Sequence, residues 1–270
     1  MDERTEPAEI IQPAGMVELV VDGVPVLRYL RGDGERPLAD LAQALVPVAE
    51  VAPAVLRELA GWQLATDDRA LEQELVGHGA TLVRHAHVLS FDLIADADRL
   101  DPAWAHPELS YPLRVTGVDR PADAFTDVEL AAFPPGHPDH EFADGAHARQ
   151  MLQELLDGAT VGPYLPAASG LVLDGERVVA FLLANRMTGT PPLGGPWLSD
   201  VARLPDPAYR GVGMALVRRA LVALADAGEP AFGLAVSDGN PARRLYEELG
   251  FVHRHSARRL QLPGSGAGGA

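Results

Sequence analysis

The chain has 270 residues, a formal net charge of −16 and 47% hydrophobic residues. All 22 basic residues are arginine, and the absence of cysteine excludes disulfides, thiolate metal sites and a cysteine nucleophile. The acidic balance argues against a nucleic-acid partner, because neutralising phosphates requires a basic surface. No apolar run reaches the length of a membrane span, and the first residues lack the pattern of a signal peptide. We therefore expect a cytoplasmic protein.

In the first third of the chain, the residue pattern predicts strands at the two ends and helices between them. The strands are expected over 25–31 and 80–93, and a long helix over 38–59. A second helix is expected to open within 61–67 and to close at Gly79. A shift of 171 residues places four residues of this part on identical residues near the end of the chain: Asp67, Gly79, Ala86 and Leu89 on Asp238, Gly250, Ala257 and Leu260. We interpret this as a degenerate repeat; the alternative is an unrelated α/β extension.

The middle of the chain begins with residues 95–110, whose Asp, Pro and Ala content predicts a linker. A strand is expected over 113–118, and helices over 122–133 and 146–156 are expected to flank an irregular loop. Asp174-Gly175-Glu176 predicts the turn of a hairpin between strands 169–173 and 177–186.

The segment Ala208-Tyr209-Arg210-Gly211-Val212-Gly213 lies between a strand-like run over 197–204 and an amphipathic helix over 214–227. Two glycines at this spacing let the backbone approach a diphosphate closely, while amides of the turn and the helix N-terminus point at the anion. A short Gly-x-Gly is also typical of an ordinary helix-opening turn, and it is the context that favours the anion site.

The last segment begins with a buried strand around 234–236 and a turn over 237–239. Asn240 then offers an N-cap, and Pro241 occupies the first helical position, where its missing N–H has no cost. The helix is expected to end at Gly250, and a strand is expected over 251–262.

This order of elements, with the Gly-x-Gly turn and the run Asn-Pro-Ala-Arg-Arg-Leu-Tyr-Glu-Glu-Leu-Gly-Phe at 240–251, resembles the GCN5-related N-acetyltransferase (GNAT) superfamily. The resemblance implies an α/β fold with a mixed, mostly antiparallel sheet flanked by helices over 111–262. It also implies that residues 1–94 form a degenerate half-domain of the same design, as in tandem acetyltransferases similar to mycothiol synthase. Residues 263–270 are expected to form a flexible tail.

The resemblance also implies acetyl-CoA as co-substrate and a set of cofactor-binding residues. Backbone groups of the splayed strand bind the pantetheine arm, and the turn binds the diphosphate. The implied residues are Val201, Ala202, Arg203, Arg210, Gly211, Val212, Gly213, Met214, Ala215 and Asn240. Ala208 departs from the Arg or Gln usual in the family, which should weaken binding unless an arginine compensates. Asn240 has an equally good interpretation as a helix cap alone.

The catalytic residues implied are Tyr246, which would hydrogen-bond the departing sulfur and supply its proton, and a carboxylate base. The alternative for Tyr246 is a ring packed in the core. Asp200 and Glu141 are the base candidates, with Glu129 as a further one. We expect transfer of acetyl from acetyl-CoA to an amine of a small molecule or a protein, with no nucleic acid or membrane partner, in a monomer or homodimer. The alternative is a non-catalytic acyl-CoA sensor or regulatory module.

Histidines gather in two places. The spacing of His137, His140 and His147 fits no common metal-ligand pattern, so we expect a mobile acceptor-binding loop and no metal. His85 and His87 alternate along a predicted strand and face one side, and we assign them a structural role.

Overall fold

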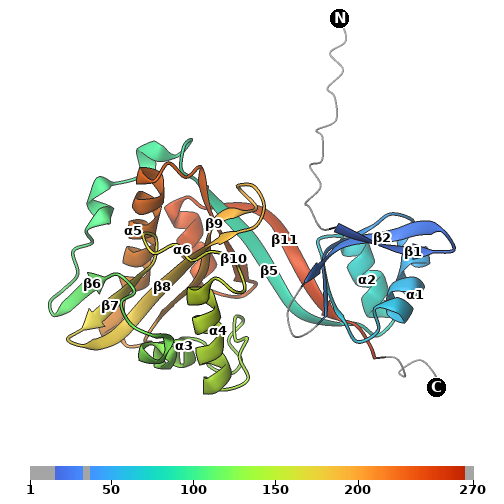
Figure 1. Cartoon of the computed structure of the whole chain (residues 1–270), viewed down its shortest axis with the longest axis horizontal. Coiled ribbons are helices and arrows are strands. Elements are labelled where there is room, and N and C mark those ends of the chain that lie inside the picture. Colours follow the sequence, from blue (N-terminus) through green and yellow to red (C-terminus); the bar gives the residue numbers. More distant parts are fainter. Residues whose placement is uncertain (1–15, 33–36, 265–270) are drawn as a thin grey trace, which may run out of the picture. The chain divides into compact units, whose positions relative to one another are not determined.

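The computed structural model describes residues 16–32 and 37–264 (Figure 1). The chain divides into two compact units, Met1–Val83 with Ala257–Ala270, and Arg84–Ser256. The expected linker at 95–110 therefore lies within the second unit, and the division at residue 94 does not coincide with the observed one. Most of the expected flexible tail, residues 265–270, lies outside the described residues.

The first unit is a sheet with two helices. Its elements are β1 (Met16–Val21), β2 (Val24–Gly32), β3 (Leu38–Ala44), α1 (Val48–Glu58), β4 (Gln63–Thr66) and α2 (Arg69–Gly77). The last part of β11 (Val252–Gln261) lies beside β4 and completes the strand order β1-β2-β3-β4-β11. Pairing is antiparallel except between β3 and β4. Leu27, Val55, Leu71 and Leu260 are fully buried in its core.

The long helix predicted over 38–59 is wrong, because its first part forms strand β3 and only Val48–Glu58 is helical. Alanine and leucine favour a helix, but pairing with β2 and β4 overrides this preference. Pro47 disfavours helical backbone at the residue before it, so α1 begins after the proline. The segment expected to open the next helix is likewise strand β4, and α2 begins at Arg69 after the capping side chain of Asp68.

The second unit contains the remaining elements. They are β5 (Thr81–Asp92, which begins in the first unit), η1 (Ala97–Arg99), η2 (Pro102–Ala105), β6 (Leu113–Thr116), η3 (Ala122–Ala124), α3 (Thr126–Ala132), α4 (Gly145–Asp157), β7 (Gly170–Asp174), β8 (Arg177–Met187), β9 (Gly195–Arg203), η4 (Pro207–Tyr209), α5 (Val212–Asp226), β10 (Ala231–Ser237) and α6 (Ala242–Leu249). The strand order is β11-β5-β10-β9-β8-β7-β6, and β10 and β9 are parallel. These elements agree with the pattern predicted from residue 113 onward.

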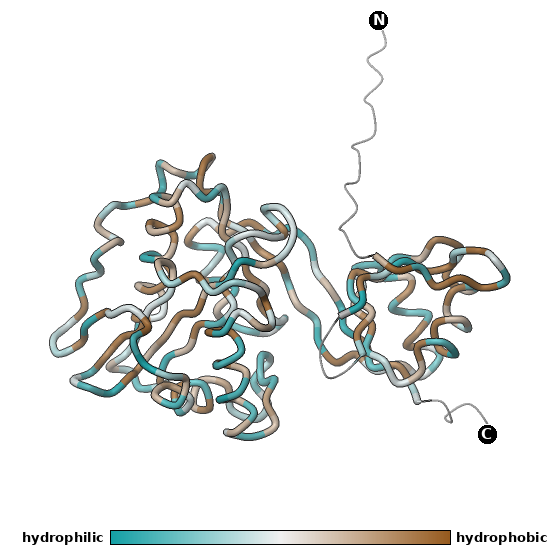
Figure 2. Tube along the Cα trace, in the orientation of Figure 1, coloured by the Kyte–Doolittle hydropathy of each residue, from teal (hydrophilic) through white to brown (hydrophobic). Residues whose placement is uncertain are grey.

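Helices cover both faces of this second sheet. Phe181 and Leu182 are neighbours on β8 and therefore point to opposite faces. Phe181 contacts Phe125 beside α3, with 4.9 Å between ring centroids. Gly170, the partner of Leu182 on β7, lies against Leu216 of α5. Figure 1 accordingly shows α3 and α4 on one side and α5 on the other. Figure 2 shows that the central strands between them consist largely of hydrophobic residues.

Each sheet includes a strand from the other half of the sequence. β5, at the end of the first half, pairs antiparallel with β10, whereas β11, at the end of the chain, pairs with β4. The order β1-β2-β3-α1-β4-α2 also matches β7-β8-β9-α5-β10-α6, with a parallel pair at the same place in both. A shift of 171 residues carries the start of β5 onto the start of β11. This order supports the predicted duplication, which stays an inference.

Candidate functional site

The neighbouring strands β9 and β10 are hydrogen-bonded only near their beginnings. Their paired residues are Trp197 with Gly233 and Leu198 with Leu234. Beyond these pairs, Asp200–Arg203 of β9 remains paired with β8 on its other side but has no partner in β10. The expected splay is therefore present, and it leaves one backbone edge of β9 open.

A β-bulge in β9 explains this splay. Leu183 of β8 pairs with Asp200 and Ala184 pairs with Leu198, so Ser199 is the extra residue on β9. A bulge bends its strand and increases the local twist, which turns the end of β9 away from β10. Ser199 donates a hydrogen bond of 2.8 Å to the amide oxygen of the fully buried Asn185. The amide nitrogen of Asn185 donates to the carbonyls of Leu155 in α4 and of Gly162 in the loop after it, so the bulge is held in a satisfied polar network.

The Gly-x-Gly turn forms the N-terminus of α5 beside this open edge. Gly211 has φ +88° and ψ −14°, a left-handed conformation that glycine adopts without strain. The first helical bond runs from Ala215 N–H to Gly211 C=O. The amides of residues 212–214 therefore have no acceptor among the described residues. A Cβ on Gly213 would lie 3.9 Å from Val201 Cγ2, which places the helix end next to β9.

Arg203 and Arg210, the two arginines predicted to bind the cofactor, differ in their hydrogen-bond and ion-pair partners. Arg203 donates to the carbonyl of Leu204 at 2.7 Å, so its side chain stabilises the loop after β9. Arg210 is exposed and has no ion-pair partner within residues 16–32 and 37–264. The turn itself is fixed by Asp206, whose carboxylate accepts a 2.8 Å hydrogen bond from Ala208 N–H. Arg210 therefore leaves its charge uncompensated by an ion pair at this turn.

Tyr246 of α6 has a buried ring near the carboxylates of the splayed strands. Its ring contacts Phe251 at 5.8 Å between centroids, and the side chain is 7% exposed. Its hydroxyl has no hydrogen-bond partner in the described part of the chain. Burial, followed by the charges of Asp200 and Asp139, raises the pKa of the Tyr246 hydroxyl well above its ordinary value. The hydroxyl is therefore a protonated donor that lacks an acceptor within the protein.

Asp200 and Glu129 form a pair of carboxyl groups between β9 and α3. The two groups are close enough that each acts on the pKa of the other, and Glu129 Oε2 is buried with no hydrogen-bond partner among the described residues. Burial raises the pKa of Asp200 to about 7, although Glu129 and the amide of Val201 oppose the shift. Burial, and then the Asp200 charge, raises the pKa of Glu129 still further. Two carboxyl groups with separated pKa values can hold and accept a proton near neutral pH.

A network of polar side chains surrounds this pair at the end of β10. Arg84 of β5 bonds Ser237 Oγ at 2.8 Å and Asp139 at 2.9 Å, and it forms an ion pair with Glu141. Asp139 also accepts a 2.6 Å hydrogen bond from the Asn240 amide. Arg84 thus neutralises part of an acidic cluster whose remaining charge raises the pKa of Asp200.

The side chains of Glu141 and Asn240, predicted as a base and as a cofactor contact, are both bonded to other protein groups. Glu141 lies near the pair, but its carboxylate is engaged by Arg84. Asn240 accepts a hydrogen bond of 2.8 Å from Ala242 N–H at the start of α6 and donates to Asp139. Both ends of its side chain are used within the protein, which favours the interpretation as a cap.

Sequence reasoning did not identify Arg84 and Asp139, and it did not pair Glu129 with Asp200. Arg84 and Asp139 are separated by 55 residues and come from parts of the chain that had been assigned to different domains. Neither residue belongs to a motif, so no local signal indicated them. The pairing of Glu129 with Asp200 depends on how α3 lies against β9, which residue spacing does not reveal.

His137 and His140 in the loop before α4, and His147 in the first turn of α4, bond nearby backbone groups. His137 accepts from Asp139 N–H, His140 bonds the Phe133 carbonyl and His147 accepts from Ala143 N–H. In the described residues they form no cluster with metal-ligand spacing, whereas His85, His87 and Asp238 do.

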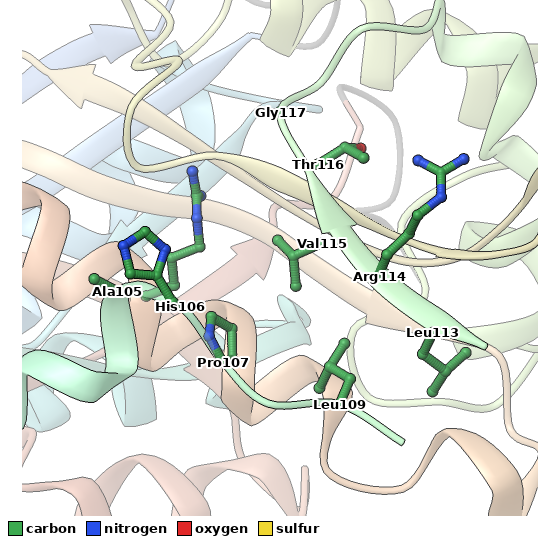
Figure 3. A pocket seen from close by; sticks show the side chains of 10 residues that line it. Ala105, His106, Pro107, Leu109, Leu113, Arg114, Val115, Thr116 and Gly117 are labelled. Atoms are coloured by element: carbon green, nitrogen blue, oxygen red, sulfur yellow. The ribbon is translucent and has the colours of Figure 1, made fainter. Parts of the chain in front are cut away.

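A separate hollow of about 540 Å³ lies between the segment before β6, β6 itself and α5 (Figure 3). It is lined by Ala105, His106, Pro107, Leu109, Leu113, Arg114, Val115, Thr116, Gly117 and Arg219. None of these residues belongs to the predicted cofactor or catalytic set. Across the described ranges, no helix combines the length and apolar character that a membrane crossing would need.

Comparisons with known proteins agree with this geometry. A family model described as FR47-like protein, a group related to GNAT, matches residues 190–260. No curated protein matches the sequence. Solved structures do match, including a GCN5-related N-acetyltransferase from Sphaerobacter thermophilus, with a TM-score of 0.59 and 16% identity over 90% of this chain and 79% of that one.

Two further structures have similar scores. One is a GCN5-related N-acetyltransferase from Kribbella flavida, with a TM-score of 0.53 and 18% identity over 94% of this chain and 91% of that one. The other is a tandem GNAT protein from the clavulanic acid biosynthesis pathway, with a TM-score of 0.54 and 15% identity over 92% of this chain and 83% of that one. The resemblance to the GNAT superfamily is thus confirmed in the fold of the chain and, over residues 190–260, in its sequence.

Proposed function

We propose that this protein is an N-acetyltransferase that moves an acetyl group from acetyl-CoA to an amine. The likeness to GNAT structures supports a general role of this kind. The observation that carries the proposal is the set of unpaired amides at the N-terminus of α5 beside the open edge of β9. That arrangement offers donors for a diphosphate next to a strand edge that can pair with an extended amide chain.

We place the diphosphate at the unpaired amides of residues 212–214, with Arg210 as the nearby cation. The pantetheine arm, which contains amide groups, pairs with the open edge of β9 at Val201, Ala202 and Arg203. The charge of Asp200, on the same strand, raises the pKa of the Tyr246 hydroxyl, so this hydroxyl lies near that part of β9. An arm that follows β9 therefore brings the thioester toward Tyr246.

In the proposed reaction the neutral amine attacks the thioester carbonyl carbon directly. A C–N bond forms, the C–S bond breaks, and coenzyme A leaves as a thiolate. The nitrogen of the attacking amine loses one proton, which the ionised carboxylate of Asp200 accepts directly or through water. Glu129 holds its own proton through this cycle, so the pair returns to its starting state when the proton passes to solvent.

Tyr246 is proposed to donate a hydrogen bond to the departing sulfur. An ordinary thiol has a pKa of about 8.5, which is below that of a free phenol at about 10. Because the site raises the pKa of Tyr246 further, complete proton transfer to the thiolate is unfavourable. Donation without transfer is favourable, since hydrogen bonds to a charged acceptor are stronger than those to a neutral one.

The acceptor is proposed to be a cationic amine in its resting form. Asp139, Glu141 and the ionised Asp200 contribute more negative charge near the splay than Arg84 neutralises. An amine of pKa about 10.4 is almost entirely protonated at neutral pH, so acidic groups attract it and a base must then remove its proton.

The first experiment measures coenzyme A binding by calorimetry for the wild type and for Gly213→Ala. The substituted methyl has ordinary contact with Val201, so the fold is retained, yet it occupies space where we place the diphosphate. We expect the variant to lose about two- to thirtyfold in affinity, the range of one or two helix-end contacts. Absence of binding by the wild type would reject the proposal, and equal affinity of the variant would reject this placement.

The second experiment measures release of the coenzyme A thiol with a panel of amines for the wild type and Tyr246→Phe. Loss of one hydrogen bond to a charged sulfur should slow the chemical step about ten- to a hundredfold, with coenzyme A affinity unchanged. An unchanged single-turnover rate removes the role of Tyr246. Coenzyme A binding without thiol release for any amine would favour the acyl-CoA sensor instead.

A further inference from the structure

Three side chains with metal-binding groups meet at the end of β10, outside the site described above. His85 and His87 point to the same side of β5, and Asp238 directly follows the last residue of β10. One ligand atom of each lies within 4.8 Å of the others. The backbone N–H of Asp238 donates to the carbonyl of His85 at 2.7 Å, which holds the main chain of Asp238 next to β5.

The two distances between the histidines and Asp238 are close to those of ligands that share one ion. His87 Nε2 lies 3.0 Å from Asp238 Oδ1, and His85 Nδ1 lies 3.7 Å from Asp238 Oδ2. Two ligands of a tetrahedral Zn²⁺ at about 2.1 Å each are about 3.4 Å apart, which lies between these two values. Small movements of the Asp238 side chain, which is 61% exposed, bring both distances to that value.

A second layer of hydrogen bonds can orient the His87 ring. His87 Nδ1 and His253 Nε2 both lie 2.9 Å from the hydroxyl of Ser256. One hydroxyl can accept from one ring and donate to the other. When His87 Nδ1–H donates to Ser256, the ring is neutral and its Nε2 carries a lone pair. This lone pair faces the Asp238 carboxylate, which is also an acceptor. Two acceptors at this distance are stabilised by a cation between them. Metal-binding histidines commonly have such a partner on the other nitrogen.

We propose that His85, His87 and Asp238 bind a divalent transition-metal ion of the Zn²⁺ class, with the remaining coordination position open to water or a ligand. Two imidazoles and a carboxylate suit this class better than Mg²⁺ or Ca²⁺, which prefer oxygen ligands. The competing arrangement is a protonated His87 paired with Asp238. Arg243 also bears on Asp238 electrostatically, but its guanidinium is bonded to Glu247 at 2.9 Å. This proposal does not depend on the acetyltransferase activity.

The test titrates Co²⁺ into untagged full-length protein that has been treated with a chelator, and follows visible absorption, with Zn²⁺ as competitor. We expect one equivalent per chain, a tetrahedral type of spectrum, and displacement by Zn²⁺. Asp238→Asn keeps a hydrogen-bond acceptor for His87 but removes the charge, and it should weaken binding by tenfold or more. His85→Asn is the second variant, and Glu248→Gln on α6 is a matched acidic control that should bind as the wild type does.

Circular dichroism verifies that each variant is folded before titration. Two outcomes would overturn the proposal. One is less than half an equivalent bound by the wild type, which would leave the cluster as an imidazolium–carboxylate pair. The other is unchanged binding in both folded variants, which would place the ion elsewhere on the chain.

Discussion

Replacing Glu129 by glutamine tests whether the Glu129–Asp200 pair holds a proton in the folded protein. Glutamine has nearly the shape of the protonated acid, so packing at this position, which is 7% exposed, is preserved. In the unfolded chain both carboxyl groups ionise at ordinary pKa values. In the folded chain burial raises both pKa values, so the folded state binds more protons and its stability falls as pH rises.

The expected magnitude follows from one bound proton. Above the pKa of Asp200, which is about 7, only Glu129 still holds a proton that the unfolded state lacks. The free energy of unfolding then decreases by about 1.4 kcal/mol per pH unit, or about 2.7 kcal/mol over two pH units. Glu129→Gln has no such proton. The stability of the variant relative to the wild type should therefore increase by about that amount from about pH 7 to about pH 9.

The measurement is urea denaturation of both proteins at several pH values across this window. Titrating groups outside the Glu129–Asp200 pair contribute equally to both proteins and cancel in the difference. Glu154→Gln on the surface of α4, where the carboxylate only accepts from Gln150, is the control and should show no pH-dependent difference. If the stability difference between Glu129→Gln and the wild type is the same at all pH values, Glu129 is ionised in the folded state and the argument for a shared proton fails.

Two smaller changes test local geometry. Gly211→Ala places a side chain at φ +88° with no atom within 4 Å of the new Cβ, so the cost is conformational alone. Thermal denaturation should show that the free energy of unfolding falls by about 1–2 kcal/mol. An unchanged free energy would mean that the turn is not left-handed in solution. Asn240→Ala removes the bond to Ala242 N–H and the bond to Asp139. We expect about 1–2 kcal/mol of destabilisation with coenzyme A affinity retained, and a selective loss of affinity would instead restore Asn240 as a cofactor contact.

Most of the second unit could be predicted because its elements are set by local signals. Asp174-Gly175-Glu176 separates β7 from β8, Gly211 opens α5 and Gly250 ends α6, each at the expected place. The first unit was harder because Leu38–Ala44 has a helix-favouring composition, and only its pairing with β2 and β4 makes it a strand. Pro47 and Pro53 were local signals against a continuous helix, and α1 begins after the first of them.

The residues of the candidate site likewise fall into those that local motifs indicate and those that only long-range pairing brings there. The glycine turn, Tyr246 and Asp200 lie in segments with a recognisable spacing, so the sequence was sufficient to name them. Arg84 could not be found in this way. It reaches Asp139 only because β5 pairs with β10, and that pairing joins residues more than a hundred positions apart.

The exchange of terminal strands gives the first half of the chain a direct part in the candidate site. β5 pairs with β10 along the whole stretch from Ala231 to Ser237, so without β5 the strand that ends at the site would be an exposed edge. The same strand supplies Arg84, which bonds Ser237 and limits the negative charge around Asp200. The turn between β3 and α1 contains no glycine, yet β5 from the same half of the chain contributes a side chain to the candidate site. The acetyltransferase-like segment 111–262 is therefore an incomplete unit, because part of its sheet and one of its charges come from the residues before it.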